Sequence, residues 1–252
     1  MREWREFVDA FHDERAGAAA DLLSRCLAGG ESPLRWLARS VSDASTKVLD
    51  IGCGAGSMTR VLAREQRTVV GLDLSEAELR EAARRGGGPW VRADAMRLPI
   101  ATGSIDAVVT SMGLAVIQPT ESLLDEIARV MRPGGMFAGT VPTYRPVNRS
   151  DMALMSRLAW LLGGPPRFPV RLNMSLGPLL MAHGLRKVED ARERYYFSIR
   201  TRADAHVLLR ALYLPSASDS RIRRTEDCLT ARAEECGPVK VPIPFRRVVA
   251  IK

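Results

Sequence analysis

The stretch Val48-Leu-Asp-Ile-Gly-Cys-Gly-Ala-Gly56 decides the fold of this chain. It is a short apolar strand that contains an acid, Asp50, and runs into a glycine-rich turn. Glycine at positions 52, 54 and 56 lets the backbone approach a ligand, because no Cβ stands in the way. The helix expected over SMTRVLAREQ would point its N-terminal N–H groups toward the same ligand. Together, the strand, turn and helix favour a nucleoside-binding site.

A second acid, Asp73, ends the next apolar stretch, RTVVGLDLS. A carboxylate at that place can accept hydrogen bonds from both ribose hydroxyls of an adenosine. A dinucleotide site has the pattern G-x-G-x-x-G, but the third glycine is replaced here by Ser57. Asp50 would repel a pyrophosphate and suits a cationic group, such as the ammonium of a methionine moiety. These residues favour S-adenosylmethionine over NAD.

Predicted strands and helices alternate outward from this motif. The segments WVRADA, SIDAVVTSMG and GMFAGTVP have the pattern of further short strands, and helices are expected over 75–85 and over TESLLDEIARVMR. Such alternation predicts a parallel sheet covered on both faces. The rhythm returns near the C-terminus with LRKVEDARERYYFSI and RRVVAIK.

Two segments differ from this pattern. The first 42 residues are predicted to be helical, with Trp4, Phe7, Val8 and Phe11 at helical spacing. The stretch 143–182 is broken by prolines and glycines around an apolar helix candidate, DMALMSRLAWLL. Its composition is that of a lid, so Met155 and Trp160 are predicted to contact the substrate. Phe11 of the N-terminal helix is predicted to contact it as well. We expect a single domain with four parts: a helical cap (1–44), a cofactor-binding core (45–142), a lid (143–182) and C-terminal strands with a helix that complete the sheet (183–252).

Composition excludes several classes of protein. The chain has 252 residues, 46% of them hydrophobic, which is enough for a sizeable core. The net charge of +8 comes mostly from scattered arginines without interleaved aromatics, so no nucleic-acid partner is expected. No apolar run is long enough to span a membrane. The charged N-terminus and four cysteines without CxxC spacing predict a cytoplasmic protein, and no cluster of metal ligands is found.

The segments VLDIGCGAG, GLDLS, RADAMRLPI, SIDAVVTSMGL and ARVMRPGGMF resemble successive motifs of class I S-adenosylmethionine-dependent methyltransferases. The resemblance covers about 46–142 and is greatest to the small-molecule branch that includes the ubiquinone/menaquinone biosynthesis methyltransferases. It implies a Rossmann-like, doubly wound, mostly parallel seven-stranded sheet with N-terminal helices and an inserted helical lid. It also implies S-adenosyl-L-methionine as cofactor, S-adenosyl-L-homocysteine as product, and a small, largely apolar acceptor methylated on O, C or N.

The resemblance assigns roles to cofactor-binding residues. Asp50 would anchor the amino end through water, Asp73 would hold the ribose, and Asp94 would accept from the adenine amine. The other residues expected around the cofactor are Gly52, Cys53, Gly54 and Gly56 under the methionine part, Leu74, Ala95 and Met96 at the adenine, and Ser111 and Met112 nearest the sulfonium.

The N-terminal helix supplies two further candidates. His12 is the candidate catalytic residue, since this helix often caps the site in the family. Arg15 falls within the apolar stripe if the helix continues. Either the helix ends near Asp13, or Arg15 faces inward to pair with the cofactor carboxylate or an acidic substrate.

Two other functions remain open at this point: an RNA or protein methyltransferase, and a non-methylating S-adenosylmethionine binder such as a cyclase. We expect a monomer or homodimer acting on a small-molecule acceptor.

Overall fold

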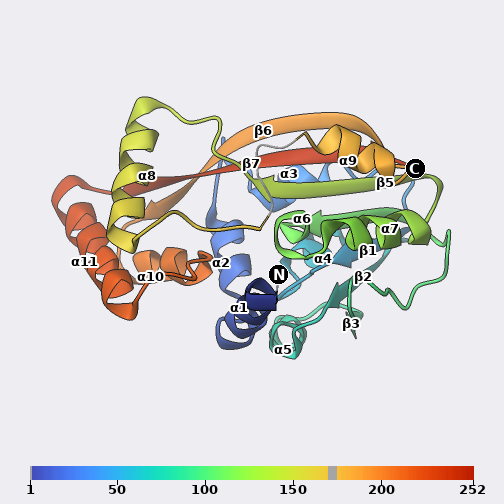
Figure 1. Cartoon of the computed structure of the whole chain (residues 1–252), viewed down its shortest axis with the longest axis horizontal. Coiled ribbons are helices and arrows are strands. Elements are labelled where there is room, and N and C mark those ends of the chain that lie inside the picture. Colours follow the sequence, from blue (N-terminus) through green and yellow to red (C-terminus); the bar gives the residue numbers. More distant parts are fainter. Residues whose placement is uncertain (1, 170–174) are drawn as a thin grey trace.

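Seven strands form one sheet in the order β3-β2-β1-β4-β5-β7-β6. The computed structural model describes residues 2–169 and 175–252, and Figure 1 shows helices around the sheet. β7 runs antiparallel to both of its neighbours, and the other pairs are parallel. This arrangement confirms the predicted doubly wound, mostly parallel sheet. The strands are β1 (Lys47–Ile51), β2 (Thr68–Asp73), β3 (Trp90–Arg92), β4 (Ile105–Ser111), β5 (Met131–Pro142), β6 (Arg186–Ile199) and β7 (Val239–Ile251).

Most helices lie where the sequence periodicity predicts them. In chain order they are α1 (Arg2–Glu14), α2 (Ala18–Arg25), α3 (Pro33–Ala38), α4 (Ser57–Leu62), α5 (Glu76–Arg84), α6 (Gly113–Val116), α7 (Thr120–Val130), α8 (Arg149–Leu162), α9 (Leu176–Ala182), α10 (Arg202–Ala211) and α11 (Asp219–Cys236).

The sheet buries both of its faces, because neighbouring residues of its central strands point to opposite sides. Val48 packs in one apolar core with residues of α2, α3, α4 and α10, and Leu49 packs in the other with residues of α6, α7 and α9. Both side chains are essentially inaccessible to solvent. Central parallel strands therefore read as continuous apolar runs in the sequence.

The direction of strand addition reverses at β1. The chain adds β2 and β3 on one side of β1 and then crosses to add β4 and β5 on the other. Two crossover connections therefore leave a crevice between the carboxyl ends of β1 and β4, where open α/β sheets bind ligands.

The segment 143–182 packs beside the C-terminal elements. α8 contacts α11 and β7, and Figure 1 shows α8, α10 and α11 together at the end where β6 and β7 extend beyond the parallel strands. Residues 170–174 of the predicted lid lie outside the described residues. In the described part of the chain, no helix has both the length and the apolar character needed to cross a membrane.

The predicted N-terminal cap divides into two parts. Leu22, Trp36 and Leu37 of α2 and α3 belong to a core beneath the sheet, whereas α1 lies apart from it and contacts α5. α1 ends at Glu14, which agrees with the interpretation that the helix stops near Asp13.

We expect Gly71→Ala to destabilise the protein by about 1–3 kcal/mol, the range for an overfilled core. A Cβ on Gly71 would lie 2.6 Å from the Trp90 ring and 2.8 Å from the Thr59 hydroxyl. Urea unfolding measures the change. The control is Gly177→Ala in α9, where the new Cβ would meet only Lys187 at 3.6 Å. Equal stability of the two variants would contradict this packing.

Candidate functional site

A cavity of about 1170 Å³ opens at the carboxyl ends of the parallel strands. It exceeds the 300–1,000 Å³ of an ordinary small-molecule site, so it has room for a cofactor and an acceptor together. Strand-end residues form one part of its wall. They are Gly52, Cys53 and Gly54 after β1, Asp73 and Leu74 at β2, Asp94, Ala95 and Met96 after β3, and Ser111 and Met112 at β4.

The glycine turn after β1 is held by the neighbouring strand. The N–H groups of Gly52 and Cys53 both donate to the Leu72 carbonyl, at 2.8 and 3.0 Å. Gly52 and Gly54 have φ of 67° and 50°, a region that favours glycine. Cys53 is buried, and burial raises the pKa of its thiol, so it remains an unreactive small residue of the turn.

Asp50 lies behind this turn and does not appear among the described cavity-lining residues. Its side chain is fully buried. Oδ2 accepts a hydrogen bond from the Thr59 hydroxyl at 2.6 Å, and Oδ1 has no hydrogen-bond partner among the described residues. Burial raises the pKa of Asp50 to about 7, and the nearby Asp73 charge acts in the same direction. A carboxylate in this position is stabilised by a cation placed in the cavity in front of it.

Asp73 reaches the cavity from the end of β2. Its two oxygens accept the N–H groups of Gly54 at 2.8 Å and Ser75 at 2.9 Å. A carboxylate can accept about four hydrogen bonds, so capacity remains for two ligand hydroxyls. Burial raises the pKa of Asp73, while the His12 charge and the two N–H donors oppose this.

Asp94 is shared with the N-terminal helix. Oδ1 accepts the Met96 N–H at 2.9 Å, and Oδ2 pairs with the Arg5 guanidinium at 3.4 Å. Both side chains of this pair are partly exposed, so the pair contributes only about 0–1 kcal/mol. An amine ligand at Asp94 would compete with Arg5 at little cost.

Met112 has a strained backbone at the end of β4. Its φ is 72°, which is uncommon for a residue with a side chain, and it forms the N-terminal cap of α6. Such strain typically marks functional sites. Ser111, beside it, hydrogen-bonds the Thr140 hydroxyl at 3.5 Å.

Gly56 lies at the end of the glycine turn, against a large side chain. Gly56 is not among the described lining residues, and a Cβ there would lie 2.3 Å from the Trp90 ring. This glycine therefore makes room for a tryptophan rather than for the methionine part of a ligand.

Another part of the cavity wall is apolar. It is formed by α2, α3, the end of β5, α8, the segment after α10 and the start of β7. These elements contribute Ala19, Ala20, Leu22, Leu23, Leu34, Pro142, Met155, Ala211, Leu212, Pro242, Ile243, Pro244 and Phe245. Elements far apart in the sequence thus build a single apolar chamber beside the strand ends.

Three predicted residues outside the strand ends lie away from this wall. Trp160 is 78% exposed and lies off the described wall, whereas Met155 of the same helix, α8, lines the cavity. Phe11 is buried and stacks on Tyr213 with ring centroids 4.4 Å apart, so it supports the wall from behind. The Arg15 guanidinium lies 5.2 Å from the Phe11 ring centroid, also off the described wall.

His12, the predicted catalytic residue, lines the cavity and makes two hydrogen bonds. Nδ1 contacts Glu78 Oε1 at 2.8 Å, and Nε2 contacts the Tyr213 hydroxyl at 3.0 Å. Burial alone lowers the pKa of His12, but the hydrogen bond with Glu78 and the charges of Glu78, Asp73 and Asp13 outweigh it. The pKa of His12 therefore lies above its usual 6.5.

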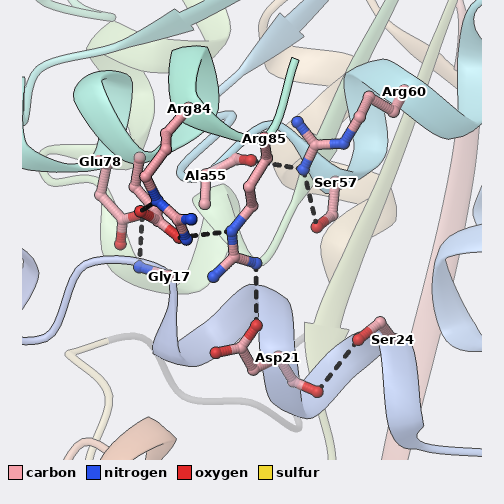
Figure 2. Close-up of polar contacts among 10 residues, drawn as sticks. Gly17, Asp21, Ser24, Ala55, Ser57, Arg60, Glu78, Arg84 and Arg85 are labelled. Carbon is pink, nitrogen blue, oxygen red and sulfur yellow. Dashed lines mark hydrogen bonds and ion pairs between the residues drawn. The ribbon is translucent and has the colours of Figure 1, made fainter. Parts of the chain in front are cut away.

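Glu78 is fixed at the start of α5. Its Oε2 accepts the Gly17 N–H at 3.0 Å, a contact shown in Figure 2. Arg85 also joins the two helices on either side of this contact. Its guanidinium hydrogen-bonds Asp21 of α2 at 2.8 Å and Glu81 of α5 at 2.6 Å. These bonds tie the segment after α1 to α5.

Sequence patterns did not reveal Glu78 or Tyr213. Ser75-Glu-Ala-Glu78 has the spacing of a helix capping box, and the Ser75 hydroxyl does accept the Glu78 N–H at 3.3 Å. The Glu78 side chain, however, turns to His12. Tyr213 follows α10 within a short apolar run, and no local signal links it to a residue 201 positions away.

Part of the sequence is similar to known proteins. Residues 49–139 match a family model described as a methyltransferase domain. Over this segment the chain is similar to a methyltransferase domain. Over 90 residues it is 42% identical to a demethylmenaquinone methyltransferase of Beutenbergia cavernae, a match covering 35% of this chain and 38% of that protein. The chain spans about half or less of the curated relatives it matches.

Solved structures of other proteins have the same fold as this chain. The Haemonchus contortus phosphoethanolamine N-methyltransferase 2 superimposes with a TM-score of 0.61 at 18% identity, over 99% of this chain and 60% of that one. The [4+2]-cyclase SpnF superimposes with a TM-score of 0.62 at 20% identity, over 97% and 94%. At these identities the likeness concerns the fold.

We expect the His12 imidazole to titrate above 6.5 in the free protein, and its pKa to fall in Glu78→Gln. The variant removes the negative partner that stabilises the imidazolium, so the burial penalty dominates. NMR titration measures this, because the chain has only 3 histidines, and His183→Gln and His206→Gln assign the other signals. An unchanged His12 titration in Glu78→Gln would contradict the assigned pair.

Proposed function

We propose that this chain transfers the methyl group of S-adenosyl-L-methionine to a small, largely apolar acceptor and releases S-adenosyl-L-homocysteine. One observation carries the proposal: a single cavity joins the strand-end carboxylates to the apolar chamber. The methyltransferase domain at 49–139 supports the reaction type. A relative named demethylmenaquinone methyltransferase and a neighbour crystallised with S-adenosylhomocysteine support the substrate class and the cofactor.

The residues of the site fit this cofactor. Asp50 is a buried carboxylate with one unpartnered oxygen, which suits a cationic amino group nearby. Asp73 retains acceptor capacity for ribose hydroxyls, and Asp94 retains it for an adenine amine. The glycine turn presents bare backbone to the methionine part, since Gly52 and Gly54 line the cavity without a Cβ.

Bound there, the cofactor supplies an electrophilic methyl group on a sulfonium. The residues of the chain mainly position the acceptor, because an in-line displacement depends on alignment. The apolar chamber excludes water from that path and favours a ring or chain without net charge. Ser111 and Met112 lie where the strand-end part and the chamber meet.

A labelled-methyl assay tests the proposal. The protein is incubated with S-adenosylmethionine carrying a labelled methyl group and with phenols, quinols, amines and tRNA, with and without EDTA. We expect transfer to an apolar small molecule, insensitive to EDTA. Transfer to tRNA alone, or cofactor binding without any transfer, would overturn the proposal in favour of an RNA methyltransferase or a non-methylating binder.

We expect Asp73→Ala to weaken S-adenosylhomocysteine binding at least tenfold. Hydrogen bonds to a charged acceptor contribute about 1.5–3 kcal/mol each, and about 1.4 kcal/mol is tenfold in affinity. Calorimetry measures the affinity. The control is Asp106→Ala, since Asp106 also accepts backbone N–H groups, those of Thr46 and Lys47, but lies outside the cavity wall. Equal affinities in both folded variants would remove the ribose assignment.

We expect Met155→Ala to impair acceptor turnover while cofactor affinity stays within about threefold, since Met155 belongs to the apolar chamber. Steady-state kinetics with the methylated acceptor measures the effect. Met152→Ala on the same helix is the matched control, because Met152 is 57% exposed and off the described wall. If the two variants behave alike, α8 does not contact the acceptor.

A further inference from the structure

Three side chains from distant parts of the chain form one hydrogen-bonded series at the cavity. Glu78 comes from α5, His12 from α1, and Tyr213 from the segment between α10 and α11. The series runs from Glu78 through both nitrogens of His12 to the Tyr213 hydroxyl, over 2.8 and 3.0 Å. All three residues line the cavity.

The chemistry of the partners fixes the direction of these bonds. A carboxylate can only accept, so the proton of the neutral imidazole lies on Nδ1 and is donated to Glu78. Nε2 is then an acceptor, and the Tyr213 hydroxyl donates its proton to it. The phenolic oxygen keeps its lone pairs free to accept a hydrogen bond from another group.

The surroundings hold Tyr213 rigidly beside the end of β4. Its ring stacks on Phe11, contacts the Phe168 ring at 5.5 Å and belongs to the apolar cluster against which Met112 packs. Tyr213 is 5% exposed and Glu78 is 2% exposed. A polar series this well buried and fully paired provides a preorganised group within the cavity.

We propose that Tyr213 is the acid–base residue that takes the proton of the acceptor during methyl transfer, with His12 and Glu78 as its positioning residues. The inference rests on the proposed function and deepens it: the methylated atom of the acceptor is an oxygen or nitrogen that carries a hydrogen. The series assigns His12 a role through Tyr213 rather than by contact with the acceptor.

Atoms and electrons are conserved in the proposed methyl transfer. A bond forms between the acceptor oxygen or nitrogen and the methyl carbon, and the carbon–sulfur bond breaks with its electron pair remaining on sulfur. The proton of the acceptor passes to the Tyr213 oxygen as the phenolic proton of Tyr213 moves to His12 Nε2. The resulting imidazolium is stabilised by Glu78, and by the charges of Asp73 and Asp13. The proton leaves to solvent when the product departs.

The relay needs neutral His12 at the start, which gives the reaction a pH dependence. The groups that face His12 are Glu78, Asp73, Asp13 and the Tyr213 hydroxyl, and the three acids hold the pKa of His12 above 6.5. The cationic form therefore persists to a higher pH than in an ordinary histidine. We expect kcat to fall on the acidic side as His12 becomes protonated, with a midpoint above 6.5.

The first test is Tyr213→Phe. It removes the hydroxyl but keeps the ring that stacks on Phe11, so the fold is preserved. We expect kcat to fall about 10²–10⁴-fold, the range for general acid–base catalysis, with S-adenosylhomocysteine affinity by calorimetry within about threefold. Tyr196→Phe is the matched control, since its hydroxyl also contacts an acid, Asp151, but away from the cavity wall. Unchanged kcat in Tyr213→Phe would overturn the proposal, as would a loss confined to cofactor affinity.

The second test separates proton transfer from a structural role. In Glu78→Gln we expect the acidic limb of the kcat profile to move to lower pH, following the His12 titration seen by NMR, while the plateau falls. His183→Gln is the control, because His183 forms an equivalent pair with Asp125 at 2.6 Å away from the cavity wall. A limb that does not follow His12 would overturn the relay.

The two proposals fail differently. If the wild-type protein transfers no methyl group to any acceptor, the proposed function fails whatever the variants do. If it methylates an acceptor and Tyr213→Phe matches the wild type, or if the methylated atom proves to carry no hydrogen, only the relay is wrong.

Discussion

The burial of the Asp50 carboxylate is the constraint on which the rest of this site depends. It lies one residue before the carboxyl end of β1, fully inaccessible, with one oxygen bonded to Thr59 and the other without a partner among the described residues. An uncompensated buried charge is expensive, so a protein keeps one only where something offsets the cost. The crevice at the carboxyl ends of β1 and β4 lies at the same end of the sheet, and under the proposed function a cationic ligand bound there would offset this charge.

The other features of the site follow from that crevice. The glycine turn lets a ligand approach the backbone beside Asp50, and Asp73 and Asp94 extend the acceptor row along the strand ends. Beyond Met112 the wall becomes apolar, because α2, α8 and the start of β7 converge there with no charged residue of theirs on the described wall. The cavity wall thus passes from charged to apolar, and the residues of the Glu78–His12–Tyr213 series line it as well.

The local sequence predicted the fold and the strand-end residues of the site. The apolar runs that contain Asp50 and Asp73 predict parallel strands, because neighbouring residues are buried on opposite faces of the sheet. The topology of the sheet then brings the residues at the ends of these strands together. The rest depended on contacts between distant segments. Trp160 belongs to an apolar stretch, yet helix rotation turns Met155 inward instead. Gly56 makes room for the Trp90 ring, and Tyr213 lies beside His12 because its ring stacks on Phe11 of α1. Periodicity contains no information about such pairings.

The pH dependence of S-adenosylhomocysteine binding tests the central claim most directly. With the pKa of Asp50 raised to about 7, a cationic ligand favours the ionised form and releases a proton on binding. Calorimetry between about pH 5.5 and 8.5, in buffers of different ionisation enthalpy, should show affinity rising with pH to a plateau above 7, with proton release on the acidic side. Asp50→Asn should bind more weakly and lose this component. The same pH profile and proton release in the folded variant would contradict the account.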